Sequence, residues 1–287
     1  MRHQILAVLC VMAFGFPVQA EVKPWDDAFK KQWYAGLAEI TRYELKQARY
    51  RDVHDGDAVL IFVTEDFLNK EQVKHERGDG EITSVLKLNF TRNFTTGIYP
   101  YSMMTSTFTP VESNQRTLKA TTSVQEWCGH TYTQLNYRNE HYHGILRSYF
   151  QSEGDPNVVV DGMLEDEIWT RIRLAPEQLP IGEVQLIPGL QFQRLAHVFP
   201  DEQTATTEMV TEETTQTYRV TYSTIPRTLS ITFEKAYPHA ILSWEESHQQ
   251  RGKWLTTTGK KTHSIMLDYW SKHDAADSTY RAQLGLK

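Results

Sequence analysis

Apolar and polar residues alternate with a period of two through most of this chain, and this pattern constrains the fold more than any other feature. A period of two places successive side chains on opposite faces of a strand, whereas a helix needs a period near 3.6. Long helical periodicity is scarce. Many strands at regular spacing favour a sandwich or a curved, partly closed barrel. We therefore predict a mainly β protein: a long curved antiparallel sheet or open half-barrel, with few short helices including a C-terminal one.

Turn signals between the alternating runs delimit the expected strands. His54-Asp55-Gly56-Asp57 has hairpin-turn chemistry, so residues 37–50 and 58–67 are predicted to form the first long hairpin. Residues 118–137 and 142–151 are expected as two long strands joined at Arg138-Asn139-Glu140. Helical pattern is expected at 23–31, as a short helix or loop, and at 269–284, with Gly285 as a stop. The remaining predicted strands are 85–90, 97–101, 167–174, 192–198, 204–211, 217–223, 229–233, 241–246 and 254–266.

Residues 1–20 have the three-part layout of a secretory signal peptide. Met1-Arg2-His3 is a short cationic start, an apolar run of 12 residues follows at 5–16, and Val18-Gln19-Ala20 precedes an abrupt change of character. The run is shorter than the about 18 residues needed to span a bilayer. We predict cleavage near Ala20, and hence a periplasmic or secreted mature protein without a transmembrane segment.

The mature chain, residues 21–287, is expected to form a single β-rich domain that is long enough for a real hydrophobic core. The Gly154-Asp155-Pro156-Asn157 turn indicates a division into two similar halves that meet near residues 154–164. The whole chain has a formal net charge of −6, and removal of Arg2 makes it more negative by one. This mild acidity argues against a nucleic-acid partner, which needs clustered Lys and Arg.

The sequence has two cysteines, Cys10 and Cys128. Leu9 before Cys10 and the apolar residues after it do not fit a lipoprotein signal, so Cys10 is expected to leave with the signal peptide. Cys128 is then alone, and no internal disulfide can form. The hairpin register predicted above places Cys128 on an apolar face, so we expect a buried core residue. The alternatives are a nucleophile paired with His130 or an intermolecular bridge. The face would also carry Tyr132, Tyr142, Leu146 and Phe150.

Two polar clusters could carry chemistry. Cys128, His130, His141 and His143 have zinc-ligand chemistry, but the same register separates Cys128 from His143 by about 23 Å, so we expect no metal site. Glu165-Asp166-Glu167 lacks the spacing of a calcium loop and is predicted to be a solvated turn and strand edge. Signatures of serine hydrolases, P-loops, dinucleotide folds and HExxH metalloproteases are absent, and we expect no cofactor.

Aromatic residues are distributed along the predicted strands, where they could line an apolar concavity between a curved sheet and a covering segment. For each of them, ordinary sheet core is the alternative. The candidate ligand-binding residues are Tyr99, Tyr101, Trp127, Tyr132, Trp169 and Trp244.

Five strings, which span most of the mature chain, resemble a family of secreted bacterial proteins of unknown function. They are residues 56–67, 85–89, 96–102, 125–130 and 237–245. Some members carry the label septum formation inhibitor, but an exported β protein without a phosphate-binding loop gives no support to the nucleotide pyrophosphatase activity that the label implies. More distantly, the layout resembles the open half-barrel of the periplasmic lipoprotein-localisation carriers. There a long curved antiparallel sheet wraps helices around an apolar cavity. The features that carry this resemblance are the long successive strands and residues 164–174, read as the strand that opens a second half.

These observations predict a non-enzymatic protein of the cell envelope that uses its curved sheet to bind a lipophilic ligand or a partner chain. One alternative is a secreted hydrolase or modifying enzyme with a polar cleft assembled by the fold. Another is a structural or assembly partner that acts through an exposed strand edge. The oligomeric state is not predicted.

Overall fold

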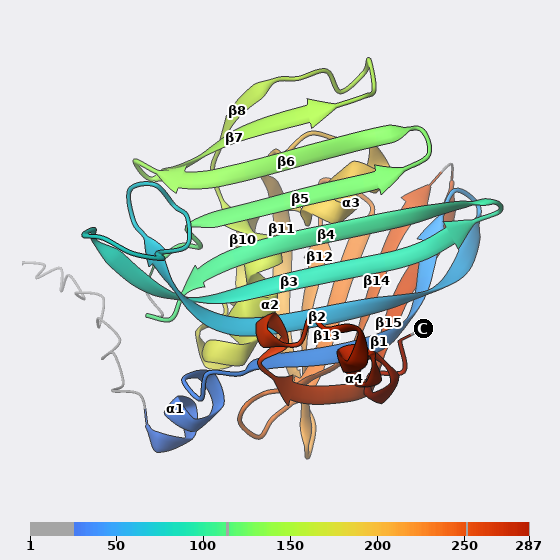
Figure 1. The fold of residues 1–287 in the computed structure, drawn as a ribbon. Helices are drawn as coiled ribbons and strands as arrows, with labels where there is room; N and C mark the ends of the chain where they lie inside the picture. The colour runs from blue at the N-terminus through green and yellow to red at the C-terminus, as the bar shows by residue number, and fades with distance from the viewer. Residues whose placement is uncertain (1–25, 113–114, 251, 287) are drawn as a thin grey trace, which may run out of the picture.

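The computed structural model describes residues 26–112, 115–250 and 252–286, so the predicted signal peptide lies outside the described residues. Within these ranges, 15 strands form one large open sheet, accompanied by four short α-helices (Figure 1). The prediction of a mainly β protein with a long curved antiparallel sheet and few short helices, one of them C-terminal, is confirmed.

The first part of the chain is a short helix followed by an antiparallel meander in which each strand pairs with the next. The helix is α1 (Asp27–Trp33), and the strands are β1 (Ala38–Arg49), β2 (Asp52–Leu68), β3 (Ile82–Thr96), β4 (Tyr99–Pro110), β5 (Lys119–Glu126), β6 (Gly129–Arg138), β7 (His141–Ser148) and β8 (Asn157–Val160).

The second part contains two helices between its first strands and then a second meander. Its elements are β9 (Met163–Leu164), α2 (Glu165–Leu174), β10 (Gly182–Ile187), α3 (Leu190–Ala196), β11 (Gln203–Thr211), β12 (Thr215–Tyr222), β13 (Arg227–Glu234), β14 (Ile241–Gln250) and β15 (Lys253–Leu267). A 3₁₀ turn, Pro176–Gln178, follows α2. β15 pairs with β1, so the first and last strands lie together inside the sheet, and only β9 and β10 pair in parallel.

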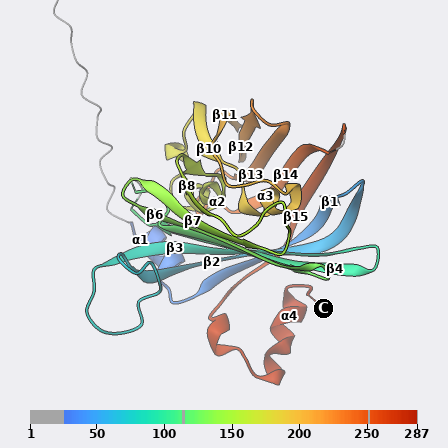
Figure 2. The ribbon, with the colours of Figure 1, turned by 90° about the horizontal axis from the view of Figure 1, so that it is seen from above.

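The sheet curves around α2 and α3, which lie between its two sets of strands (Figure 2). Alternation produces this core directly: along β13, every second residue from Arg227 to Phe233 is buried, and the residues between them are partly exposed. Only Asp161 and Gly162 separate β8 from β9, so the two edges of the sheet come together there. A small apolar cluster that includes Val160, Leu164 and Ile187 packs this junction.

The C-terminal segment packs on the outer face of the sheet, on the side away from α2 and α3 (Figure 2). Leu284 contacts a cluster of β1 and β2 residues that includes Ile40 and Val59. The helix predicted at 269–284 is present as two 3₁₀ turns, Tyr269–Ser271 and Ala275–Ser278, and the short helix α4 (Thr279–Gln283). Gly285 follows with a positive φ, as expected of a helix stop.

One predicted turn was wrong, and one turn was missed. The first hairpin turns at Tyr50 and Arg51, and residues 54–57 lie inside β2, paired with β1. Residues 118–137 are two strands, because Trp127 and Cys128 form a tight turn between β5 and β6. Neither Trp127 nor Cys128 is a typical turn residue, so this turn was missed.

Residues 167–174 and 192–198, predicted as strands, lie mostly in α2 and α3. The two helices are surrounded by sheet and are buried on nearly every side, including Glu165, Thr170 and Arg173 of α2. A helix without a solvated face lacks the 3.6-residue apolar stripe, and its short apolar runs read equally well as strands.

Candidate functional site

Trp169 of α2 and Trp244 of β14 belong to the interior of the fold. Their rings meet edge to face with centroids 5.4 Å apart, and Phe90 of β3 packs against both. Both tryptophans are buried. Ordinary core, the alternative considered for them, is therefore where the structure places them.

Tyr99, Tyr101 and Trp127 come together at one end of the sheet, at the turns that join β3 to β4 and β5 to β6. The Tyr99 ring lies 5.7 Å from that of Tyr101 and 6.3 Å from that of Trp127. Tyr50, at the β1–β2 turn, joins the group: its hydroxyl lies 2.6 Å from that of Tyr99 and 3.0 Å from that of Tyr101. Tyr132, the sixth candidate, instead donates from its hydroxyl to Gln134 Oε1 along its own strand, at 2.7 Å.

This end of the sheet is a rim of turns with exposed apolar side chains, and we refer to it as the hairpin-tip rim. An antiparallel meander brings every second turn to the same end, so the rim collects the turns at 50–51, 97–98, 127–128, 149–156, 197–202, 223–226 and Gly252 (Figure 1, right-hand side for the first three). The most exposed side chains are Ile98 at 79%, Trp127 at 68% and Tyr149 at 66%. Tyr50, Val53, Val198, Phe199 and Trp254 are also exposed there.

Polar contacts on the interior side of the rim hold its turns in place. Arg49 donates to the Tyr101 hydroxyl at 3.3 Å and to the Leu195 carbonyl at 2.5 Å, and its guanidinium stacks 4.2 Å above the Tyr50 ring. Burial raises the pKa of Tyr101, so its hydroxyl stays protonated.

A second set of contacts ties α3 to the β5–β6 turn and to the loop after β7. Arg194 lies 3.5 Å from Glu126 and 3.9 Å from Glu153, and His197 Nδ1 lies 2.6 Å from Glu153. The backbone N–H of Cys128 donates to Glu126 at 2.6 Å. The rim therefore presents its apolar side chains on turns that side-chain contacts already hold in place.

Cys128 is exposed, and the prediction that it is a core residue was wrong. It lies in the turn instead of inside a long strand, so the register assumed for it does not exist. The hydrogen bond with the Glu126 carboxylate raises the pKa of the Cys128 thiol, which lowers the thiolate fraction at neutral pH.

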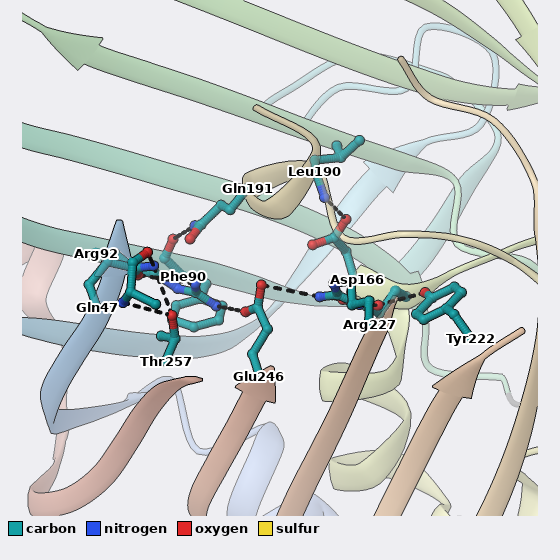
Figure 3. Close-up of polar contacts among 12 residues, drawn as sticks. Gln47, Phe90, Arg92, Asp166, Leu190, Gln191, Tyr222, Arg227, Glu246 and Thr257 are labelled. Carbon is teal, nitrogen blue, oxygen red and sulfur yellow. Dashed lines mark hydrogen bonds and ion pairs between the residues drawn. The ribbon is translucent and has the colours of Figure 1, made fainter. Parts of the chain in front are cut away.

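Ionised groups cross the interior between the two sets of strands (Figure 3). Arg227 of β13 makes a two-pronged ion pair with Glu165 of α2, with Nη2 to Oε1 at 2.7 Å, and its Nη2 lies 3.3 Å from Glu246 of β14. Arg92 of β3 lies 3.1 Å from the other Glu246 oxygen. Tyr222 donates to Glu165 at 2.6 Å. We refer to Arg92, Glu165, Tyr222, Arg227 and Glu246 as the interior charge network.

The prediction that residues 165–167 form a solvated turn and strand edge was wrong, because all three are buried in the first turn of α2. Asp166 accepts a hydrogen bond from the Leu190 N–H at the start of α3, at 2.9 Å (Figure 3). Burial raises the pKa of Asp166 to about 7. The flanking arginines Arg92 and Arg227 lower the pKa of Glu246 to about 2 against the effect of burial.

Two charged residues of this network stand at inward positions of alternating strands, which is a signal in the sequence itself. Arg92 lies on β3 in phase with the buried Phe90 and Phe94, and Arg227 is in phase with the apolar residues of β13. A charge at an inward position of an alternating strand must be paired, because an unpaired buried ion is very costly. The partner, however, comes from a helix far along the chain.

Among the described residues, little free space adjoins the interior charge network. The cavity lined by Phe90, Asp166, Gln191 and all members of the network except Tyr222 has a volume of about 10 Å³, room for about one water molecule. Two larger hollows, of about 180 and 160 Å³, lie at the end opposite the hairpin-tip rim, near Ile181 and Gln115 respectively. Neither approaches the size of a lipid acyl chain site.

Across the described residues, no group of three or more His, Cys, Asp or Glu side chains lies close enough to hold a metal ion. Cys128 and His141, considered above as zinc ligands, lie at opposite ends of β6. Ser148, Glu153 and His197 are in contact, but Glu153 bonds both of the others, so the serine has no histidine base. No helix in the described part of the chain is long and apolar enough to cross a membrane.

No protein-family model, curated protein or solved structure matches this chain significantly.

Proposed function

We propose that this is an exported, non-enzymatic protein of the cell envelope that binds an apolar partner through the hairpin-tip rim. The observation that carries the proposal is the gathering of Tyr50, Ile98, Trp127, Tyr149 and Trp254 at one end of the sheet, on separate turns. Large apolar side chains gathered in this way mark interaction surfaces.

The fixed positions of the rim side chains support a role in binding. Tyr50, Tyr99 and Tyr101 are joined by their hydroxyls, and Arg49 holds this group against α3 through the Leu195 carbonyl. Side chains already held in position lose little conformational entropy when a partner arrives, so more of the apolar burial is available as affinity.

The packing of the interior favours binding of a partner at the surface over carriage of a lipophilic ligand inside the sheet. Trp169, Trp244 and Phe90 fill the space between the two sets of strands, and the interior charge network ties α2 to β13 and β14. A ligand of lipid size would have to displace α2 or α3 and break buried ion pairs, which costs several kcal/mol.

The alternative of a hydrolase finds less support. The carboxyl groups with strongly altered pKa values, Asp166 and Glu246, face a cavity that holds about one water, and Glu246 is engaged by two arginines. A general acid or base needs access to a substrate atom at hydrogen-bond distance.

Photo-crosslinking in living cells tests the rim. A photoreactive amino acid is placed at Ile98, in the turn after β3, and, as a matched control, at Ile82, an exposed isoleucine at the opposite end of β3. We expect adducts from position 98 that are absent from position 82. Equal yields from both positions, or none from position 98, would contradict the proposal.

The export part rests on residues 1–20 and has its own test. Edman sequencing of the protein recovered from the envelope fraction is expected to start near Glu21. A chain that retains Met1 and stays in the cytosol would contradict both export and the assignment to the cell envelope.

A further inference from the structure

We infer that the partner of the hairpin-tip rim is the interfacial region of a lipid bilayer, an inference that rests on the proposed function. The residue types provide the first argument. Two tryptophans and two tyrosines, Trp127, Trp254, Tyr50 and Tyr149, are exposed there together with Ile98, Val198 and Phe199. Trp and Tyr are the side chains that settle at the level of lipid headgroups, because each ring has an apolar body and a polar edge.

The spacing of these side chains provides the second argument. Consecutive rim turns are two strands apart, or about 10 Å at the usual strand separation. The turns that carry Trp254, Tyr50, Ile98, Trp127 and Tyr149 therefore follow one another along a curved line of about 40 Å. A protein partner would have to fill the intervals between single protruding side chains. A bilayer interface accepts each one separately.

The shape of the rim agrees with a broad, fluid partner. The hollows of about 180 and 160 Å³ that could receive a peptide side chain lie at the opposite end of the sheet, near Ile181 and Arg116. Anchors of a protein interface usually pair with pockets. The rim itself offers protruding turns.

The charges around the rim indicate which lipids it would bind. Arg51 and Lys253 flank Tyr50 and Trp254, but Asp52, Asp201 and Glu202 are exposed at the same end. With both signs present, attraction to an anionic surface is weak. Binding would come from apolar insertion, so it should occur on zwitterionic lipid and depend little on salt.

Flotation with phosphatidylcholine vesicles tests the inference on the purified exported protein. We expect it to float with the vesicles at both low and high salt. The variant with Ile98→Ser, Trp127→Ser and Trp254→Ser should bind at least about tenfold more weakly. The control variant carries Ile82→Ser, Ile181→Ser and Val210→Ser, three exposed apolar positions at the opposite end, and should bind as the unmodified protein does.

The other outcomes separate this inference from the proposed function. Failure to bind vesicles, with adducts from Ile98 only to a protein, would overturn the bilayer and leave the rim as a binding surface. Binding that requires anionic lipid and disappears in salt, or equal losses in both variants, would also overturn the inference. Far-ultraviolet circular dichroism shows whether each variant is folded, and adducts at Ile98 in the unmodified protein do not depend on any variant.

Discussion

Arg227 shows how a single residue joins the helices α2 and α3 to the second set of strands. Its guanidinium is fully enclosed, pairs with Glu165 on α2 and Glu246 on β14, and lies 4.3 Å above the Phe192 ring of α3. Four elements therefore meet at one side chain. Such a pair contributes little net stability compared with an apolar replacement of both partners, but loss of one partner leaves charges buried without compensation.

We expect Arg227→Met to lower the free energy of unfolding by about 3–5 kcal/mol, because Glu165 and Glu246 would lose their shared cation. The matched control is Arg219→Met on the neighbouring strand, where the ion pair with Glu208 is half exposed. That change should cost less than about 1 kcal/mol. Urea denaturation measures both changes in the free energy of unfolding. Equal losses would show that the interior ion pairs contribute no more to stability than a surface pair does.

Asp166 should make the stability of the fold depend on pH. Its pKa is about 7 in the folded protein and near 3.8 when unfolded, so between these values the folded state alone keeps the proton. Stability from this group is therefore greatest below about pH 4 and decreases as the pH rises to about 7, by up to about 1.4 kcal/mol per pH unit.

The change Asp166→Asn should remove that dependence while keeping an acceptor for the Leu190 N–H. His248, whose pKa is lowered by burial, has the opposite trend, with stability lost as the pH falls below its ordinary value near 6.5. The informative quantity is thus the difference between the two proteins from pH 4 to 7. Parallel curves over that range would show that Asp166 titrates normally.

At the scale of elements, the strands were predictable and the helices inside the sheet were not. Residues 229–233 and 254–266, predicted as strands, lie within β13 and β15, and most other predicted strands overlap observed ones. Alternation worked there because one face is buried and the other is not. α2 and α3 have no solvated face, and the Trp127-Cys128 turn has no Asn-Gly or Asp-Gly signal, so each was read as strand.

The candidate site, like the elements, was predicted only in part from the sequence. Tyr99, Tyr101 and Trp127 were singled out from the sequence and do meet, because they border neighbouring turns of one meander. Tyr50 was missed, since it joins them only through the pairing of β1 with β2. The interior charge network could not be assembled from sequence, because Glu165 and Arg227 are paired by tertiary packing.

Gly259 of β15 shows how closely two neighbouring strands are fitted. A Cβ at this position would lie 2.1–2.3 Å from the Trp244 ring of β14, which packs against Phe90 and Trp169 and cannot move aside. We expect Gly259→Ala to cost about 1–3 kcal/mol of stability. Lys260→Ala, on the exposed side of the same strand, should stay within about 0.5 kcal/mol. Thermal unfolding of the two variants distinguishes them, and a neutral Gly259→Ala would show that the ring is free to shift.

At the scale of the whole molecule, the fold separates a filled interior from an apolar rim. The sheet wraps α2 and α3, buried ion pairs fix them, and the C-terminal segment covers part of the outer face. The exposed aromatic residues at the hairpin-tip rim are then the natural site of contact, and the interior is the alternative. Both the rim and the interior contain tryptophan, so tryptophan fluorescence can report which of the two contacts lipid.

Quenching of tryptophan fluorescence by phosphatidylcholine with brominated acyl chains distinguishes them most directly, since bromine quenches only rings that reach the lipid. Both proteins carry Trp25→Phe and Trp270→Phe, and the variant carries Trp127→Phe and Trp254→Phe as well, so it keeps Trp33, Trp169 and Trp244, which are all buried. If the rim inserts, the protein that keeps Trp127 and Trp254 is quenched and the variant is not. Quenching that persists in the variant would mean that lipid reaches the interior, and the rim would not be the site.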